Sequence, residues 1–327
     1  MAASNVLTSN QLIKSIIRRA MIPNDQNTFT DEDFLEMINE EMGYFAVPHL
    51  LQNHEEYLVN QIDYATVDAD NNLITSYPIP SRAVGNKLRD VSYVDTTGNV
   101  YELHRVSLED LSDYNNDFVN DYPQLFYVQN NNIRLVDGSP NVNETIRMHF
   151  YLKPNKLVIE DRVATISSID RVTGLITFAN IPTALIGATE LDFIQANSPN
   201  NIIGFDITPL SIDSATSSVT FTATDIPKDL QIGDHVSLAG ETVVPQLPTE
   251  LHPILAQRVA VHCLEAMGDA QGQQIAQSRL DQMEQSMLTI LDNRVEGAPE
   301  KVNNRHGPLR EATRKSRGYS RRRNGGY

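Results

Sequence analysis

The last 34 residues of the chain carry the opposite charge from the residues that precede them. Residues 294–327 hold 10 lysine and arginine residues and three glutamates, a net charge of +7, whereas residues 1–293 hold 16 basic and 39 acidic residues, a net charge of −23. The basic segment is rich in glycine, asparagine and serine, and it lacks the apolar surface that a folded core requires. We therefore expect an acidic folded body and a basic arm that becomes ordered on a partner.

Composition sets limits on the class of protein. A chain of 327 residues favours roughly two domains. The single cysteine, Cys263, excludes an internal disulfide framework, and its apolar helical neighbours predict a buried thiol. No basic segment followed by an apolar stretch opens the chain, and no apolar run approaches the ~20 residues that cross a bilayer. We expect synthesis in a cytoplasm and no membrane partner.

Helical periodicity marks the beginning of the chain. Thr8 and Gln11 form a capping-box pattern ahead of apolar residues at helical spacing, and the pattern recurs from Thr30. Pro48 is expected to open a third, short helix that reaches about Val59. These segments predict helices that each present one apolar stripe.

The helical period returns after Pro248. One stripe runs from Leu251 to Ala266 and ends near Gly268, and Asp269 is the expected N-cap of the next helix. That helix carries apolar residues at a 4-3-4-3 spacing: Ala276, Leu280, Met283, Met287 and Ile290. The pattern predicts an antiparallel helical hairpin. Packing the first and last helices on each other is the simplest way to cover their stripes, with the region between them as a long insertion.

Residues 64–247 show short alternating or β-branched runs separated by turn residues. Residues 122–128 and 131–135 predict a two-stranded hairpin that is apolar enough for a core or a subunit interface. An internal repeat follows, because residues 169–178 (IDRVTGLITF) align without gaps on residues 212–221 (IDSATSSVTF), and both are followed by Ile-Pro and then Ile-Gly. Two copies are too few for a solenoid. They predict two matched hairpins whose strands pair with each other.

The fold class predicted from these patterns is α+β: a helical bundle built from N- and C-terminal helices, a long β-rich insertion and a basic disordered C-terminal arm. The expected boundaries are 1–63 with 248–293 for the bundle, 64–157 for the β-rich insertion, 158–247 for a small duplicated β barrel or sandwich, and 294–327 for the arm.

No assembled catalytic or metal-binding motif is present in the sequence. Glycine-rich phosphate loops, a Gly-x-Ser-x-Gly elbow and a His-Glu-x-x-His pair are all missing. The segment from Asp68 to Asn72 resembles the start of a calcium loop, but Leu73 stands where glycine is required, which favours a turn. We expect no catalytic residues, no metal site and no cofactor.

Two polar clusters have residue types that could bind a metal ion. His49 and His54 differ by five positions, about 140° around a helix, which favours a polar face over a ligand pair. Their neighbours Glu55 and Glu56 join that face. A solvated edge is also the favoured interpretation of an acidic run that can in principle bind divalent ions: Asp110, Asp113, Asp117 and Asp121.

Several segments, taken in order, carry a resemblance to a known family. They are residues 122–128 (YPQLFYV), 151–158 (YLKPNKLV), 232–236 (IGDHV), 238–242 (LAGET), 245–253 (PQLPTELHP), 295–299 (VEGAP) and 303–305 (NNR). In this order they resemble the head-to-tail connector proteins of tailed bacteriophages, also called adaptor or ring proteins, in a version with a long β insertion. The likeness spans most of the chain, and no catalytic signature comes with it.

The resemblance implies a structural, non-enzymatic virion protein made in the host cytoplasm and placed in the neck, at the head-tail junction. It implies a homo-oligomeric ring of about a dozen copies around the DNA channel. The portal protein lies on one side, a tail nozzle or tail hub protein lies on the other, and packaged DNA passes through the lumen without specific binding. The arm is the expected portal-binding segment, through Arg305, Leu309, Arg310, Arg314, Lys315, Arg317, Tyr319, Arg321, Arg322 and Arg323.

Two alternatives from other functional classes remain open at this point. Basic tails bind nucleic acid without sequence specificity, although the −23 body opposes that interaction. A carbohydrate-binding or hydrolytic tail component would place function in residues 158–245. That region has no tryptophan, and the repeat-matched Phe178 and Phe221 are expected to be core residues.

Overall fold

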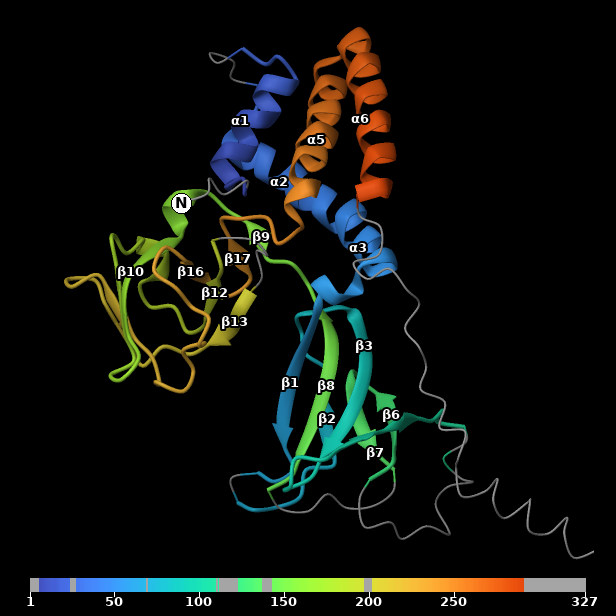
Figure 1. Ribbon diagram of the computed structural model, residues 1–327, viewed down its shortest axis with the longest axis vertical. Coiled ribbons are helices and arrows are strands. Elements are labelled where there is room, and N and C mark those ends of the chain that lie inside the picture. The colour runs from blue at the N-terminus through green and yellow to red at the C-terminus, as the bar shows by residue number, and fades with distance from the viewer. Residues whose placement is uncertain are drawn as a thin grey trace, which may run out of the picture. The chain divides into compact units, whose positions relative to one another are not determined.

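The computed structural model describes residues 6–23, 28–68, 70–109, 111, 123–136, 143–196 and 202–290, with the side chains of 287–290 excepted. The chain divides into two units, Met1–Asp292 and Asn293–Tyr327, and the first contains all the described residues. Along the sequence of this unit, helices come first and last and strands lie between them, as the colours of Figure 1 show. The predicted mixed α and β class is therefore confirmed.

The first helices begin where the sequence places them. α1 spans Ser9–Arg19 and α2 spans Asp31–Glu41, and Thr8 and Thr30 each form a capping box. A π-helical turn at Met42–Ala46 leads into α3 at Val47–Asn53.

The expected reach of this third helix to about Val59 is wrong. His54 leaves helical geometry with φ −146° and ψ 55°, a 3-10 turn follows at Glu55–Tyr57, and strand β1 begins at Val59. The helix therefore stops at Asn53, and strand structure begins earlier than the sequence pattern indicated.

The last helices form the predicted hairpin. α5 spans His252–Met267 and α6 spans Ala270–Ile290. Gly268 has φ 75°, the left-handed conformation that suits glycine at a helix end, and the Asp269 carboxylate accepts from the Gly272 N–H at 2.9 Å. Helices α1, α2 and α6 each contact α5 (Figure 1).

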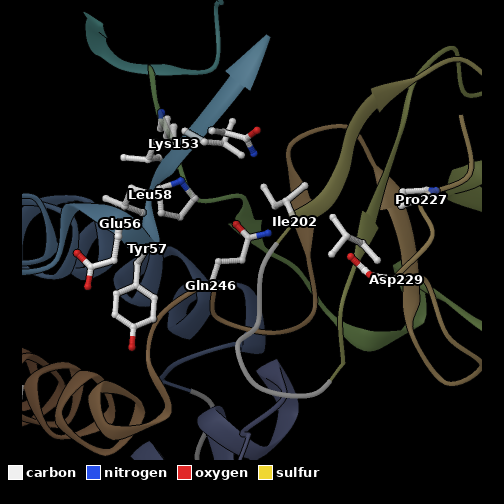
Figure 2. Close-up of a pocket in the computed structure, with 13 residues that line it drawn as sticks. Glu56, Tyr57, Leu58, Lys153, Ile202, Pro227, Asp229 and Gln246 are labelled. Carbon is white, nitrogen blue, oxygen red and sulfur yellow. The ribbon is translucent and has the colours of Figure 1, made fainter. Parts of the chain in front are cut away.

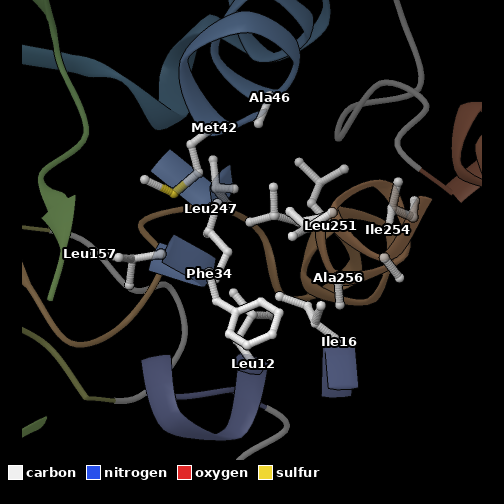
Figure 3. Close-up of a cluster of buried hydrophobic side chains, with 14 of the residues drawn as sticks. Leu12, Ile16, Phe34, Met42, Ala46, Leu157, Leu247, Leu251, Ile254 and Ala256 are labelled. Atoms are coloured by element: carbon white, nitrogen blue, oxygen red, sulfur yellow. The ribbon is translucent and has the colours of Figure 1, made fainter. Parts of the chain in front are cut away.

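Side chains from these helices share one apolar cluster. Leu12 and Ile16 of α1, Phe34 of α2 and Leu255 of α5 are almost fully buried in it. Leu157 and Leu247, which precede and follow the strands of residues 164–242 in the sequence, point into the same cluster (Figure 3). Burying an aliphatic or aromatic side chain of this size stabilises by roughly 1.5–3 kcal/mol. The apolar stripes of both ends of the chain are therefore covered together.

The first β region consists of two four-stranded sheets that share one core cluster. The first has the order β1-β8-β3-β4, with bounds Val59–Ala65, Thr145–Leu152, Ala83–Val94 and Val100–Glu102. The second has the order β2-β7-β6-β5, with bounds Ser76–Pro78, Asn132–Leu135, Leu125–Gln129 and His104–Arg105. The predicted hairpin is β6 and β7. Phe126 and Ile133 lie buried in it, so the hairpin belongs to the core.

The second β region is a seven-stranded sheet of order β13-β12-β16-β10-β11-β15-β14. Its strands span Ile202–Ile207, Leu191–Ile194, His235–Leu238, Ala164–Asp170, Leu175–Phe178, Ser218–Thr220 and Ser211–Asp213. The outermost strands β13 and β14 are joined by residues 208–210, a link that spans at most roughly 14 Å. The two edges of the sheet therefore return toward each other, and we refer to this curled sheet as the barrel.

Short elements connect the regions. A parallel pair, β9 at Lys156–Leu157 and β17 at Glu241–Thr242, joins the two ends of the barrel segment. The 3-10 turns lie at Glu160–Arg162, Thr183–Leu185 and Thr249–Leu251.

The predicted duplication is visible in the barrel. β10 with β11 and β14 with β15 form the two matched hairpins, and β11 pairs with β15 as expected. At the first turn the Asp170 carboxylate accepts from the Val172 N–H at 2.9 Å. At the second, Asp213 accepts from the Ala215 N–H at 2.9 Å. Phe178 and Phe221 are buried, as predicted for core residues.

Candidate interaction sites

The residues predicted to bind a partner all belong to the arm. Arg305, Leu309, Arg310, Arg314, Lys315, Arg317, Tyr319, Arg321, Arg322 and Arg323 lie outside the described residues. The acidic run Asp110, Asp113, Asp117 and Asp121 also lies outside them. Their roles therefore stay predictions.

The histidine and glutamate cluster is divided among separate partners. His54 is buried, and its Nδ1 lies 3.4 Å from Glu56 Oε1. The Glu55 carboxylate accepts from the Tyr151 hydroxyl at 2.5 Å and pairs with Arg89 at 3.2 Å. Within the part of the chain that the structure covers, no three histidine, cysteine or acidic residues gather in metal-binding geometry. The expected polar helix face is not formed, because the helix ends at Asn53 and His54 is buried.

The calcium-like segment forms a turn held by its own backbone. The Asp68 carboxylate accepts from the N–H groups of Asn72 at 2.8 Å and Asp70 at 2.9 Å. These hydrogen bonds, from Asn72 first, lower the pKa of Asp68. The carboxylate is therefore committed to an Asx turn, as the missing glycine indicated.

A buried polar node forms where the two β regions meet. Arg82, the residue before β3, donates from Nη2 to Asp192 Oδ2 at 3.0 Å and from Nη1 to Asp192 Oδ1 at 3.3 Å. The Asp192 side chain is fully buried, and its partner exposes only 15% of its side chain. Burial alone would lower the pKa of Arg82, but the hydrogen bonds and charges of Asp192 and Asp206 outweigh it and raise that pKa. This is a bidentate ion pair away from water.

Further contacts extend the node to three more segments. Asp206 of β13 accepts from Arg82 Nη1 at 2.5 Å. The Asn155 side chain donates to Asp192 Oδ2 at 2.6 Å and to the Glu241 carbonyl at 2.9 Å. The node therefore fixes the linker after β8 against the barrel. Sequence reasoning missed it because Arg82 and Asp192 stand 110 positions apart without a local pattern.

A pocket of about 340 Å³ lies beside the node (Figure 2). Figure 2 shows the Gln246 side chain between Leu58 on one side and Ile202 on the other. Gln246 Oε1 accepts from the Asn155 N–H at 2.5 Å, while its Nε2 has no partner in the described structure. The lining residues include no serine, threonine, cysteine or histidine.

Comparison with known proteins identifies the family. The family model described as SU10 adaptor protein matches residues 8–185, which is 178 of the 327 residues and more than half of the chain. The matched segment covers the first helices, the first β region and the first hairpin of the repeat. The chain therefore belongs to the SU10 adaptor protein family. No curated protein matches it.

Family membership confirms the resemblance to phage head-to-tail connectors. The chain is a phage structural adaptor protein and a virion component that interacts with head and tail components of the particle. Among the helices in the described ranges, none is both long and apolar enough to span a bilayer.

Proposed function

We propose that the chain forms a ring of about a dozen copies that joins the portal to the tail and surrounds the DNA channel. Its basic arm holds the portal, and its other face receives a tail nozzle or hub protein. The observation that carries this proposal is the division of charge, +7 in residues 294–327 against −23 in the rest, within a member of an adaptor family.

The acidic body suits a channel through which DNA slides. Residues 1–293 carry a net charge of −23. A ring of such bodies presents a negative surface that repels phosphates. DNA then passes without being held, which is the property that a connector needs.

The helices provide the attachment point of the arm. α6 ends at Ile290, and the arm begins in the sequence at Arg294. α5, which contacts α6, also contacts α1 and α2. We assign the helices within residues 1–63 and 248–293 to one helical bundle, 64–157 and 158–247 to two β modules, and 294–327 to the arm, with strand β1 from Val59 belonging to the first β module. Force applied to the arm would then be transmitted to the helical bundle.

The arm suits an acidic protein groove. Its cluster of eight basic residues between Arg305 and Arg323 includes seven arginines, whose planar fork pairs with carboxylates in two-point contacts. An exposed pair contributes only about 0–1 kcal/mol, so several pairs must combine with burial of Leu309 or Tyr319. Repetition around a ring then multiplies the total through avidity.

Truncation after Val302 tests the role of the arm. The truncated chain is expected to stay folded and soluble but to lose docking on portal-bearing heads, so that filled heads leak DNA or fail to gain tails. Deletion of residues 324–327 alone is the matched control, because these residues carry no side-chain charge. The control is expected to dock normally.

Two outcomes would contradict this assignment. Normal docking by the chain truncated after Val302 would move the portal contact to the helices. Salt-sensitive binding of duplex DNA by the full chain, lost on truncation, would instead support the alternative of a nucleic-acid-binding tail.

A further inference from the structure

A cluster of arginines lies on the helical part of the acidic body. Arg18 and Arg19 end α1, and Arg279 lies on α6. Arg19 Nη1 donates to Gln257 Oε1 at 2.9 Å, and Gln257 Nε2 donates to the Ala276 carbonyl of α6 at 3.1 Å, one turn before Arg279, so the end of α1 lies beside α6. After burial, the positive charges of Arg279 and Arg18 also lower the pKa of Arg19. Exposed Lys14 lies one turn before Arg18 on α1.

The cluster has no acidic partner among the described residues. No ion pair to a carboxylate is formed by Lys14, Arg18, Arg19 or Arg279 in the resolved contacts, although the body is strongly acidic. Arg19 is held instead by neutral groups, Gln257 Oε1 at 2.9 Å and Ser15 Oγ at 3.2 Å. Mutual repulsion of like charges is therefore left uncompensated within one copy.

Exposed apolar side chains accompany these cations. Ile275 lies one turn before Arg279 and is 66% exposed, and Met21 follows Arg19 by two residues and is 87% exposed. Arginine and methionine are enriched in protein interfaces, and apolar groups beside them supply the area that is buried. We call this surface the basic face: Lys14, Arg18, Arg19, Met21, Ile275 and Arg279.

α2 presents the opposite charge. Glu32, Glu36 and Glu40 repeat at four-residue spacing, so they lie on one side of the helix, and all three are exposed. We call this surface the acidic face. The side of α2 that carries Phe34 and Ile38 is buried against the helices, so the acidic face is directed away from the core.

We propose that the basic face of one copy binds the acidic face of the next copy. This inference rests on the proposed ring, because a ring is built from two different surfaces on each subunit, one meeting the other on its neighbour. Bodies with a net charge of −23 repel each other, so a contact between them needs local charge complementarity. The unpaired cations of the basic face supply this charge complementarity.

Two complementary charge-reversal variants of the full chain test this contact. The first is Arg18→Glu with Arg279→Glu, and the second is Glu36→Lys with Glu40→Lys. Arg19 is left in place because it is hydrogen-bonded to Gln257. Each variant is prepared as copies with one of two different labels. The two preparations are mixed and treated with a zero-length carboxylate-amine cross-linker. Dimers that contain both labels are then measured.

Each variant alone is expected to lose about tenfold in cross-linked dimer relative to the unchanged chain. An equimolar mixture of the two restores the dimers, because each altered face then meets an opposite charge. Arg105→Glu with Arg134→Glu is the matched control: both residues are exposed and form no ion pair within the described structure. This control is expected to cross-link normally. Helical circular dichroism confirms that all variants fold.

Other results would overturn the contact. Equal cross-linking by all variants, or failure of the mixture to restore dimers, shows that the two faces do not meet. Binding of duplex DNA that is lost in Arg18→Glu with Arg279→Glu assigns the basic face to nucleic acid instead. Neither result bears on the proposed role of the arm, because docking by the chain truncated after Val302 is measured in a separate experiment.

Discussion

Ile176 and Val219 lie directly opposite each other across β11 and β15, and they occupy equivalent positions in the two copies of the repeat. Leu175 pairs with Thr220 on one side of them, and Thr177 pairs with Ser218 on the other. Exchanging the two copies therefore reproduces the same pairs. The barrel is built around a local two-fold relationship between its two hairpins.

The two-fold relationship predicts that Ile176 and Val219 can exchange places. Both side chains are fully buried. The double variant Ile176→Val with Val219→Ile keeps the combined volume, so we expect it to lose less than about 1.5 kcal/mol of unfolding free energy. Ile176→Ala leaves a cavity and is expected to cost about 2–5 kcal/mol. Urea unfolding measures both, and an exchange variant as unstable as the alanine variant would show that the two sites are not equivalent.

The Arg82 node predicts a large cost for losing one partner. Arg82→Met leaves the buried Asp192 carboxylate without its cation, and we expect a loss of about 3–5 kcal/mol. Arg134→Met, at an exposed site, serves as the control and is expected to stay within about 0.5 kcal/mol of the unchanged chain. If Arg82→Met lost no more unfolding free energy than the control, the node would not contribute to the stability of the β regions.

We predict that the Asp95 carboxylate, which is held in a turn, becomes protonated only at low pH. Its carboxylate accepts hydrogen bonds from Thr97 and Asn99, which hold the pKa of Asp95 at about 2, below the ordinary 3.8. Because the folded-state pKa is depressed, the stabilisation is complete above about pH 4 and is lost as the pH falls through about 2. Carbon-detected NMR of the side-chain carboxylate is expected to show a midpoint near 2, and a midpoint near 4 would contradict the hydrogen-bonded turn.

Cys263 is predicted to be inert in the folded protein. It is fully buried in α5, and burial raises the pKa of its thiol to about 11. A disulfide reagent requires the thiolate and access to it, and at pH 8 only about one thiol in a thousand is ionised at such a pKa. Labelling is therefore expected only after denaturation. Rapid, complete labelling of the native chain would place the thiol at the surface.

Local signals in the sequence predicted much of the fold. Each of these signals depends on residues that are close in the sequence, and each is confirmed: the capping boxes at Thr8 and Thr30, the helix end at Gly268 and the matched hairpins. The third helix was extended too far because its polar residues continue past Asn53 without a proline or glycine to end it.

The interaction sites were harder to predict, because they depend on contacts between distant residues. Arg82 meets Asp192 across 110 positions, and the arginines of α1 and α6 come together only after α5 has packed between the chain ends. The arm was recognisable because its charge and composition are local properties of the sequence.

Electron microscopy of portal-bearing heads mixed with the purified full chain tests the central claim most directly. The account predicts added density in the form of a ring of about a dozen copies at the portal vertex, with an open axial channel, and no such ring with the chain truncated after Val302. Heads without added density at the portal, or density elsewhere on the particle, would contradict it.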